Sequence, residues 1–173
     1  MSFNYYDLTV PIFIKNLNNV RTLLERGFAH ATEKGMTEEM FLSQSLTPDM
    51  FHLKKQIQIV TDNAKGATAR LTGTPPLKIE DTEDSVAQLL ARIDTVLTYL
   101  QGFKPEQFAE AADTKTMLPF MPGQYQTGRD YVVDFALPNF FFHASMVYAI
   151  IRVQGVPIGK ADFLGGLKLH PVS

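Results

Sequence analysis

Apolar residues recur every three or four positions in four stretches of the chain, and glycine or proline residues separate these stretches. The first stretch runs from about Thr9 to Lys34, where Pro11 fits a first helical turn and Gly35 follows as a stop. Its apolar residues fall on one helical face: Val10, Ile14, Leu17, Leu24, Phe28 and Ala31. The spacing predicts a helix over 9–34.

The second stretch has the most regular pattern. Steps of three and four residues, which produce the buried seam of a helix bundle, connect its apolar positions. These positions are Met50, Leu53, Ile57, Val60, Ala64, Ala67 and Leu71. Thr47 is the predicted N-cap, Pro48 suits the first helical position, and Asp49 complements the positive end of the helix dipole. We expect this helix to begin at Thr47 and to end at Gly73.

Two further helices are predicted in the second half of the chain. The third follows a cap-like Thr82, extends along an apolar face from Val86 to Leu100 and ends at Gly102. The acidic residues 80–84 before it are interpreted as a solvated helix start. The fourth helix extends from near Pro138 to Gln154, and Gly155 is its stop.

The segment between the last two helices has a different pattern. Thr114 to Phe120 and Arg129 to Ala136 have the alternation typical of strands, and Pro122-Gly123 is a predicted turn between them. The tail from Gly155 is expected to pack irregularly over the bundle. We therefore predict an all-α four-helix bundle in one domain, 1–173, with a long crossover and a short β-hairpin before the last helix.

Composition narrows the functional classes. The 173-residue chain has a formal net charge of −2, which disfavours nucleic-acid binding. It has no cysteine, which excludes disulfides and thiolate metal ligands. No apolar run approaches the ~20 residues needed to span a bilayer, and the N-terminus lacks a secretory pattern. We expect a cytoplasmic protein that binds neither nucleic acid nor membrane.

Two histidines are the main candidates for chemistry. His52 lies beside the apolar seam of the second helix with Gln56 one turn later, and His143 follows Asn139 by one turn in the fourth helix. Facing helices of a bundle can bring such side chains together around a metal ion. A His52, Asn139 and His143 site is therefore one interpretation, and ordinary hydrogen bonding of each histidine to a neighbour is the other.

Three consecutive phenylalanines, residues 140–142, precede His143. They cover about 200° of a helix circumference, so they cannot all face one core. At least one is expected to contact another segment or a second subunit. This predicts a homodimer seam, or alternatively the apolar wall of a small-molecule pocket around His143.

Two stretches carry a family resemblance: LTPDMFHLKKQ at 46–56 and LPNFFFH at 137–143, which continues to GVPIGKADF at 155–163. Together they resemble an uncharacterised-domain family of the DinB/YfiT-like superfamily of four-helix bundles. The resemblance implies a zinc or nickel site in which His52 is the first ligand and His143 the second histidine of a later pair. Asn139 stands where the first histidine of that pair belongs, and an amide oxygen is a poor substitute for imidazole.

The resemblance leaves two functional hypotheses, with enzyme activity undecided between them. The first is a divergent metalloprotein with a small pocket at His52, His143 and Asn139, related to the metal-dependent thiol transferases of the superfamily. The second is a non-catalytic homodimeric bundle that has lost the metal.

Overall fold

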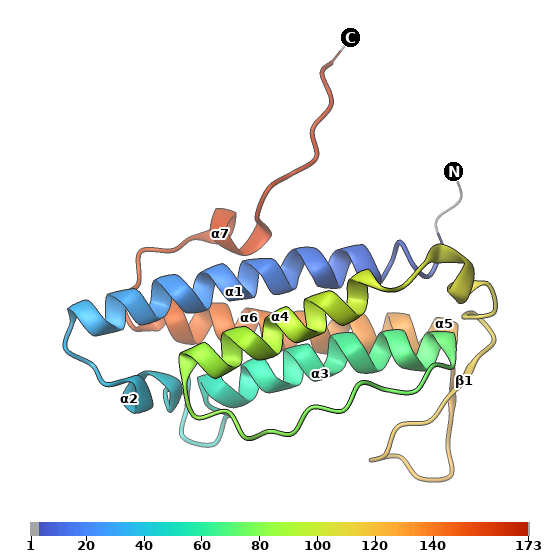
Figure 1. Ribbon diagram of the computed structural model, residues 1–173, viewed down its shortest axis with the longest axis horizontal. Coiled ribbons are helices and arrows are strands. Elements are labelled where there is room, and N and C mark those ends of the chain that lie inside the picture. Colours follow the sequence, from blue (N-terminus) through green and yellow to red (C-terminus); the bar gives the residue numbers. More distant parts are fainter. Residues whose placement is uncertain (1–3, 173) are drawn as a thin grey trace.

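Four long helices form the body of the protein in a computed structural model that describes residues 4–172 (Figure 1). They are α1 (Val10–Glu33), α3 (Leu53–Thr72), α4 (Val86–Gln101) and α6 (Leu137–Val153). Helices α1 and α3 each pack against both α4 and α6, so the order around the bundle is α1, α4, α3, α6. The predicted four-helix bundle is confirmed; the outermost residues of the predicted domain, 1–3 and 173, lie outside the described part.

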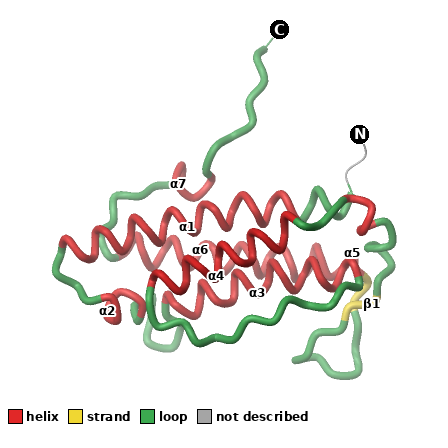
Figure 2. The backbone as a smooth tube through the Cα atoms, in the orientation of Figure 1, coloured by secondary structure: helices red, strands yellow, loops and turns green. Residues whose placement is uncertain are grey.

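The long crossover of the bundle follows α3. Residues 73–85 run back along the whole bundle as an extended loop, so α3 and α4 point in the same direction (Figures 1 and 2). Helices α1 and α6 run the opposite way. The crossover is therefore earlier in the chain than the segment before the last helix.

Helix ends agree with the sequence pattern better at the C-termini than at the N-termini. Gly35, Gly73 and Gly155 follow α1, α3 and α6 with φ values of 72°, 65° and 87°, a conformation that favours glycine. The N-cap of α3, however, is His52 and not Thr47, and the N-cap of α4 is Ser85. Residues 47–49 form part of a turn ahead of α3, which contradicts the predicted start.

The segment before α6 contains a very short hairpin. Strand β1 (Lys115–Thr116) pairs antiparallel with β2 (Gln126–Thr127). Gly123 has a φ of 77° in the turn between them, as the Pro122-Gly123 pair predicts. The 3₁₀ helix η1 (Pro105–Phe108) precedes this hairpin.

The predicted second strand, residues 129–136, is wrong. This segment forms α5 (Gly128–Asp130) and the π-helical η2 (Tyr131–Ala136), which lead directly into α6. Tyr131 and Val132 are adjacent and both buried, an arrangement that the alternation of a half-exposed strand does not allow. The segment packs against α3, so tertiary contacts outweigh the strand-like alternation of its sequence.

The merged helical stretch Gly128–Val153 is long and apolar enough to cross a membrane, by length and composition alone. The sequence pattern predicts no such run because it assigns 129–136 to a strand. In the structure α6 packs between α3 and α1. Phe140 is fully buried there, whereas Phe142 is 51% exposed, so one of the three phenylalanines does face outward. The homodimer stays a prediction.

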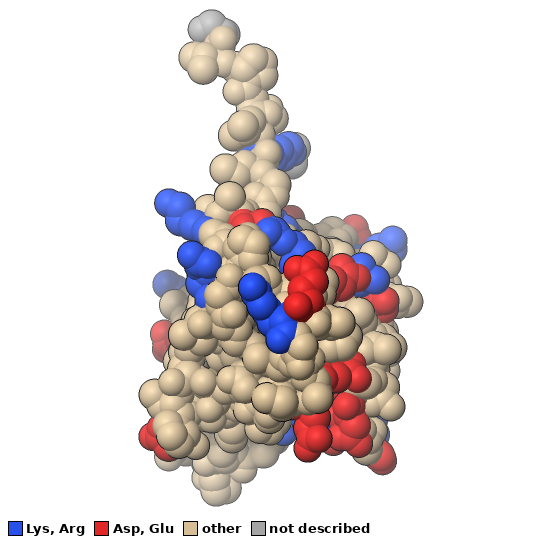
Figure 3. All heavy atoms as spheres, turned by 90° about the vertical axis from the view of Figure 1, so that its left-hand side faces the viewer, with Lys and Arg blue, Asp and Glu red and all other residues tan. Residues whose placement is uncertain are grey.

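Two short helices flank the bundle. Helix α2 (Glu38–Leu42), which the sequence pattern did not predict, connects α1 to the turn before α3. Helix α7 (Lys160–Leu164) packs on α1, but residues 166–172 extend away from the bundle and do not cover it (Figures 1 and 3). The predicted packing of the tail is thus correct only for its first part.

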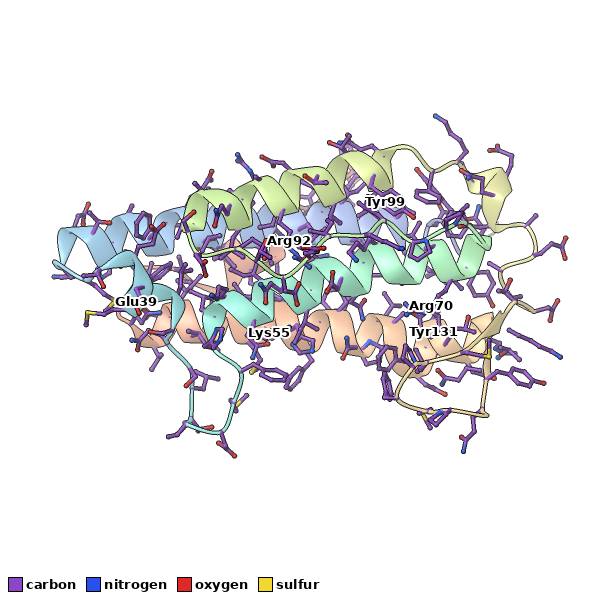
Figure 4. All side chains as sticks on the ribbon, turned by 60° about the horizontal axis from the view of Figure 1, so that its bottom comes forward. Glu39, Lys55, Arg70, Arg92, Tyr99 and Tyr131 are labelled. Atoms are coloured by element: carbon purple, nitrogen blue, oxygen red, sulfur yellow. The ribbon has the colours of Figure 1, made fainter. Side chains whose placement is uncertain are left out.

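A buried ion cluster attaches the crossover loop to α3 and α4. Arg92, whose side chain is 1% exposed, contacts Asp62 at 2.6 Å, Glu83 at 2.8 Å and Asp81 at 3.0 Å (Figure 4). Burial acts to raise the pKa of Glu83, but hydrogen bonds from Arg92 and Gln58 outweigh it and the pKa is lowered. The acidic residues 80–84 are therefore not simply a solvated helix start.

Candidate functional site: a polar seam between α3 and α6

Polar side chains line the contact between α3 and α6 at several successive levels. On α3 they occur every seven residues, which is about two helical turns and therefore one face of the helix. Side chains of α6 and of the preceding η2 lie opposite them. We call the following six residues the polar seam: Gln56, Asn63 and Arg70 of α3, with Tyr131, Asn139 and His143 opposite.

His143 and Gln56 form the first level of the polar seam. His143 Nδ1 lies 2.7 Å from Gln56 Oε1, and Gln56 Nε2 donates to the Phe51 carbonyl at 3.0 Å. Because the amide presents its oxygen to the ring, the network assigns the imidazole proton to Nδ1. Burial lowers the pKa of His143. The ring is therefore neutral near pH 7, and its Nε2 carries the lone pair.

His52 occupies a different environment at the start of α3. Its Nδ1 accepts a hydrogen bond from the Lys55 backbone N–H at 3.2 Å and so caps the helix. Burial lowers the pKa of His52, and the charges of Lys54 and Lys55 lower it further. In the neutral ring, Nδ1 is then the acceptor and Nε2 carries the proton.

His52 lines a cavity of about 450 Å³ between α2, the start of α3 and the loop before α4. The other polar lining residues are Glu39, Ser43, Lys54 and Asp84, and Lys54 and Asp84 form an ion pair at 3.1 Å. Figure 4 shows Glu39 at this end of the bundle, and Figure 3, which faces the same end, shows acidic and basic side chains next to each other. The charges of this cavity are therefore partly compensated.

The capping role of His52 predicts a pH-dependent stability. A protonated Nδ1 cannot accept the Lys55 N–H, and the lowered pKa means that the folded protein favours the neutral ring. The stabilisation by His52 is therefore complete above the unfolded pKa of about 6.5 and is lost as the pH falls below it. We expect His52→Asn, an uncharged cap, to match the wild type at pH 8 and to exceed its stability at pH 5.

Urea unfolding at both pH values measures this difference, with His52→Ala as the variant that lacks a cap. His52→Ala should cost about 0.5–2 kcal/mol at pH 8, the usual effect of losing an N-cap. Equal pH profiles for the wild type and His52→Asn would contradict the capping role.

Asn139 lies with Asn63 and Arg70 in a separate groove of about 170 Å³. The remaining groove residues come from α3, from η2 and from the hairpin loop after β1: Ile59, Asp62, Leu118, Pro119, Phe120, Tyr131 and Phe135. Asn139 therefore shares no cavity with His52. The sequence prediction grouped the two residues, and the structure assigns them to different cavities.

The amide of Asn63 contains a buried oxygen without a hydrogen-bond partner in the described part of the chain. Asn63 is 8% exposed, and its Oδ1 is buried without a hydrogen-bond partner among residues 4–172. A buried polar atom without a partner costs about 1–3 kcal/mol, and of the five such side-chain atoms among residues 4–172 only that of Asn63 belongs to a groove residue. Asn63 thus gives the groove an acceptor that a bound molecule could satisfy if the amide turns toward it.

The arrangement of His52, Asn139 and His143 does not fit a shared transition-metal ion. Binding through His52 Nε2 would require loss of the proton that this nitrogen carries while Nδ1 caps the helix. Asn139 offers only an amide from another cavity. No group of three or more histidine, aspartate or glutamate side chains within residues 4–172 is arranged to hold a metal ion.

The comparisons with known proteins place this fold in a family. Residues 5–164 match the model of a domain of unknown function, DUF1993. The chain belongs to this family. The crystal structure of a DinB family member protein from Shewanella denitrificans is 39% identical in sequence, with a TM-score of 0.92 over 96% of this chain and 95% of that one. No curated protein has significant similarity to this chain.

Sequence reasoning identified His143, Gln56 and Asn139 of the polar seam but missed Asn63 and Arg70. The seven-residue spacing of Gln56, Asn63 and Arg70 could have indicated that these polar residues lie on one face of the helix. Only the packing of α3 on α6 shows that these side chains lie at the same seam.

Proposed function

We propose that this DUF1993 protein is a ligand-binding member of the DinB-like bundles that binds a small polar organic molecule without a transition metal. The binding site is the groove between α3, α6 and the hairpin loop. The observation that carries this proposal is the amide of the groove residue Asn63, whose buried Oδ1 has no hydrogen-bond partner among residues 4–172. A ligand with a hydrogen-bond donor would satisfy this oxygen once the amide turns toward the groove.

The rest of the groove supports the same function. Asn139 supplies a second amide, Arg70 a cation, and Phe120 and Phe135 an apolar wall with ring centroids 5.5 Å apart. A few convergent polar groups in an apolar concavity are the usual composition of a small-molecule site. The groove has a volume of about 170 Å³, which suits a small metabolite.

One observation favours the alternative, a divergent metal site. His143 donates from Nδ1 to Gln56, and this contact leaves Nε2 unprotonated, as in many metal-bound histidines. A metal there would need ligands other than His52 and Asn139. The thiol-transferase activity implied by the family resemblance stays a prediction.

Ligand binding is tested by NMR on the ¹⁵N-labelled chain with a panel of small polar metabolites and fragments. We expect at least one compound to shift the side-chain amide signals of Asn63 and Asn139 together. The same compound should leave unchanged the side-chain signal of Asn18, an exposed residue of α1 that donates to the Ile14 carbonyl. A panel in which no compound shifts Asn63 would contradict the proposal.

Metal analysis tests the alternative on protein purified without a histidine tag and then incubated with zinc or nickel. We expect well under one equivalent of metal, with the same content in the His52→Ala, His143→Ala double variant. One equivalent that the double variant loses would instead establish a metal site.

A further inference from the structure

Arg70 is a cation without a carboxylate partner in the groove. No ion pair to Arg70 forms within the part of the chain that the structure describes, although most other arginines of the bundle have one. Its polar neighbour is the Tyr131 hydroxyl at 3.5 Å, and its guanidinium carbon lies 5.9 Å from the centre of that ring (Figure 4). This is a weak contact for a half-buried guanidinium, whose strongest partners are carboxylates.

Gly66 allows the guanidinium of Arg70 to lie over the backbone of α3, toward the level of Asn63. A Cβ added at Gly66 would be 2.6 Å from Arg70 Nη1, so the arginine side chain folds back over the bare backbone of α3. Residues 63 and 66 differ in height by about 4.5 Å, at 1.5 Å per residue. The cation and the unpartnered amide are therefore about one helical turn apart.

The carboxylate that lines the groove does not cancel the charge of Arg70. Asp62 is already bound by Arg92 at 2.6 Å and by Lys65 at 3.0 Å. Among the groove residues it is the only acid. Arg70 therefore remains available to an anion that enters the groove.

The walls of the groove are aromatic. The Tyr131 and Phe135 rings stack with centroids 5.9 Å apart, and Phe120 of the hairpin loop packs on Phe135. Flat apolar groups pack favourably against such rings. The groove thus combines a cation, a hydrogen-bonding amide one turn away, and aromatic faces beside them.

We propose that the groove binds a small aromatic carboxylate, with its carboxylate on Arg70 and a polar ring substituent on Asn63. This inference rests on the proposed ligand-binding function and names the ligand class for the same site. It assigns Gly66 the role of allowing Arg70 to occupy its position.

Three probes test the ligand class by NMR titration of the wild type: 3-hydroxybenzoate, its uncharged analogue 3-hydroxybenzamide, and benzoate. We expect 3-hydroxybenzoate to bind with the highest affinity and to shift the Asn63 amide. Loss of the carboxylate or of the hydroxyl should each weaken binding by about tenfold, the usual effect of one hydrogen bond to a charged or buried group.

Variants of α3 test the residues. Arg70→Gln should bind 3-hydroxybenzoate no better than the wild type binds 3-hydroxybenzamide. Lys15→Gln, which removes an exposed charge of α1, should bind it normally. Gly66→Ala should weaken binding about tenfold without lowering the melting temperature, because alanine is the better helix former and only the flexible end of Arg70 must move.

The outcomes separate this inference from the proposed function. Equal binding of 3-hydroxybenzoate and 3-hydroxybenzamide, or wild-type affinity in Gly66→Ala and Arg70→Gln, overturns the carboxylate assignment. If none of the three probes binds, the aromatic carboxylate is also overturned, while a shift of Asn63 by another compound of the wider panel would leave the ligand-binding function standing.

Discussion

Replacing Arg92 by methionine is expected to lower the free energy of unfolding by about 3–5 kcal/mol, the usual effect of removing one partner from a buried ion cluster. The Arg92 guanidinium forms ion pairs with Asp62, Asp81 and Glu83. It also donates a hydrogen bond to the Thr61 hydroxyl at 2.7 Å. Without it Glu83, whose side chain is 8% exposed, remains as a buried acid. Urea unfolding followed by circular dichroism measures the loss.

A double variant separates the charge effect from the packing effect. Arg92→Met together with Glu83→Gln leaves no buried charge, because Asp62 and Asp81 retain 39% and 35% exposure. We expect it to be more stable than Arg92→Met alone. If Arg92→Met lowers the free energy of unfolding by less than about 1 kcal/mol, the cluster behaves like an exposed surface ion pair and the prediction is wrong.

Replacing Asn63 by leucine is expected to raise the free energy of unfolding by about 1 kcal/mol and to abolish ligand binding. Leucine branches at the same carbon and removes a buried oxygen that has no partner in the folded protein. Binding sites often contain buried polar groups that lower the stability of the folded protein but are needed for function. Urea unfolding and the NMR titration measure the two effects on the same sample.

Asn19→Leu is the matched control for this variant. Asn19 on α1 donates to the Phe163 carbonyl at 2.9 Å, so its loss should lower the stability instead of raising it. If Asn63→Leu destabilises the protein as Asn19→Leu does, the Asn63 amide is satisfied in the folded chain. That result would contradict the main observation behind the proposed ligand binding.

Apolar spacing and glycine stops predicted the helices correctly wherever tertiary contacts favour the same conformation. The apolar spacing of α3 and the glycine stops after α1, α3 and α6 all match the structure. The start of α3 did not follow the Thr47-Pro48-Asp49 signal. Leu53 N–H donates to the Gln44 carbonyl at 2.8 Å, and His52, a residue with no marked N-cap preference, takes the cap.

The site was predicted only in part for a related reason. The chain places His143 one turn after Asn139, and a bundle brings α6 against α3, so a polar contact between the two helices was expected. The partner that His143 contacts is Gln56, however, while the ring of His52 turns to its own helix. Which face of a helix end points inward depends on the path of the preceding turn, which the spacing of residues does not specify.

The sequence by itself determined the class of fold, the approximate extent of four helices and the exclusion of cysteine chemistry, because these follow from periodicity and composition along the chain. The tertiary structure alone decided that residues 129–136 join α6 as a helix, that Arg92 holds the acidic loop, and that Asn63, Arg70 and Asn139 share a groove. These outcomes depend on contacts between residues far apart in the chain, where packing and hydrogen bonding outweigh local preference.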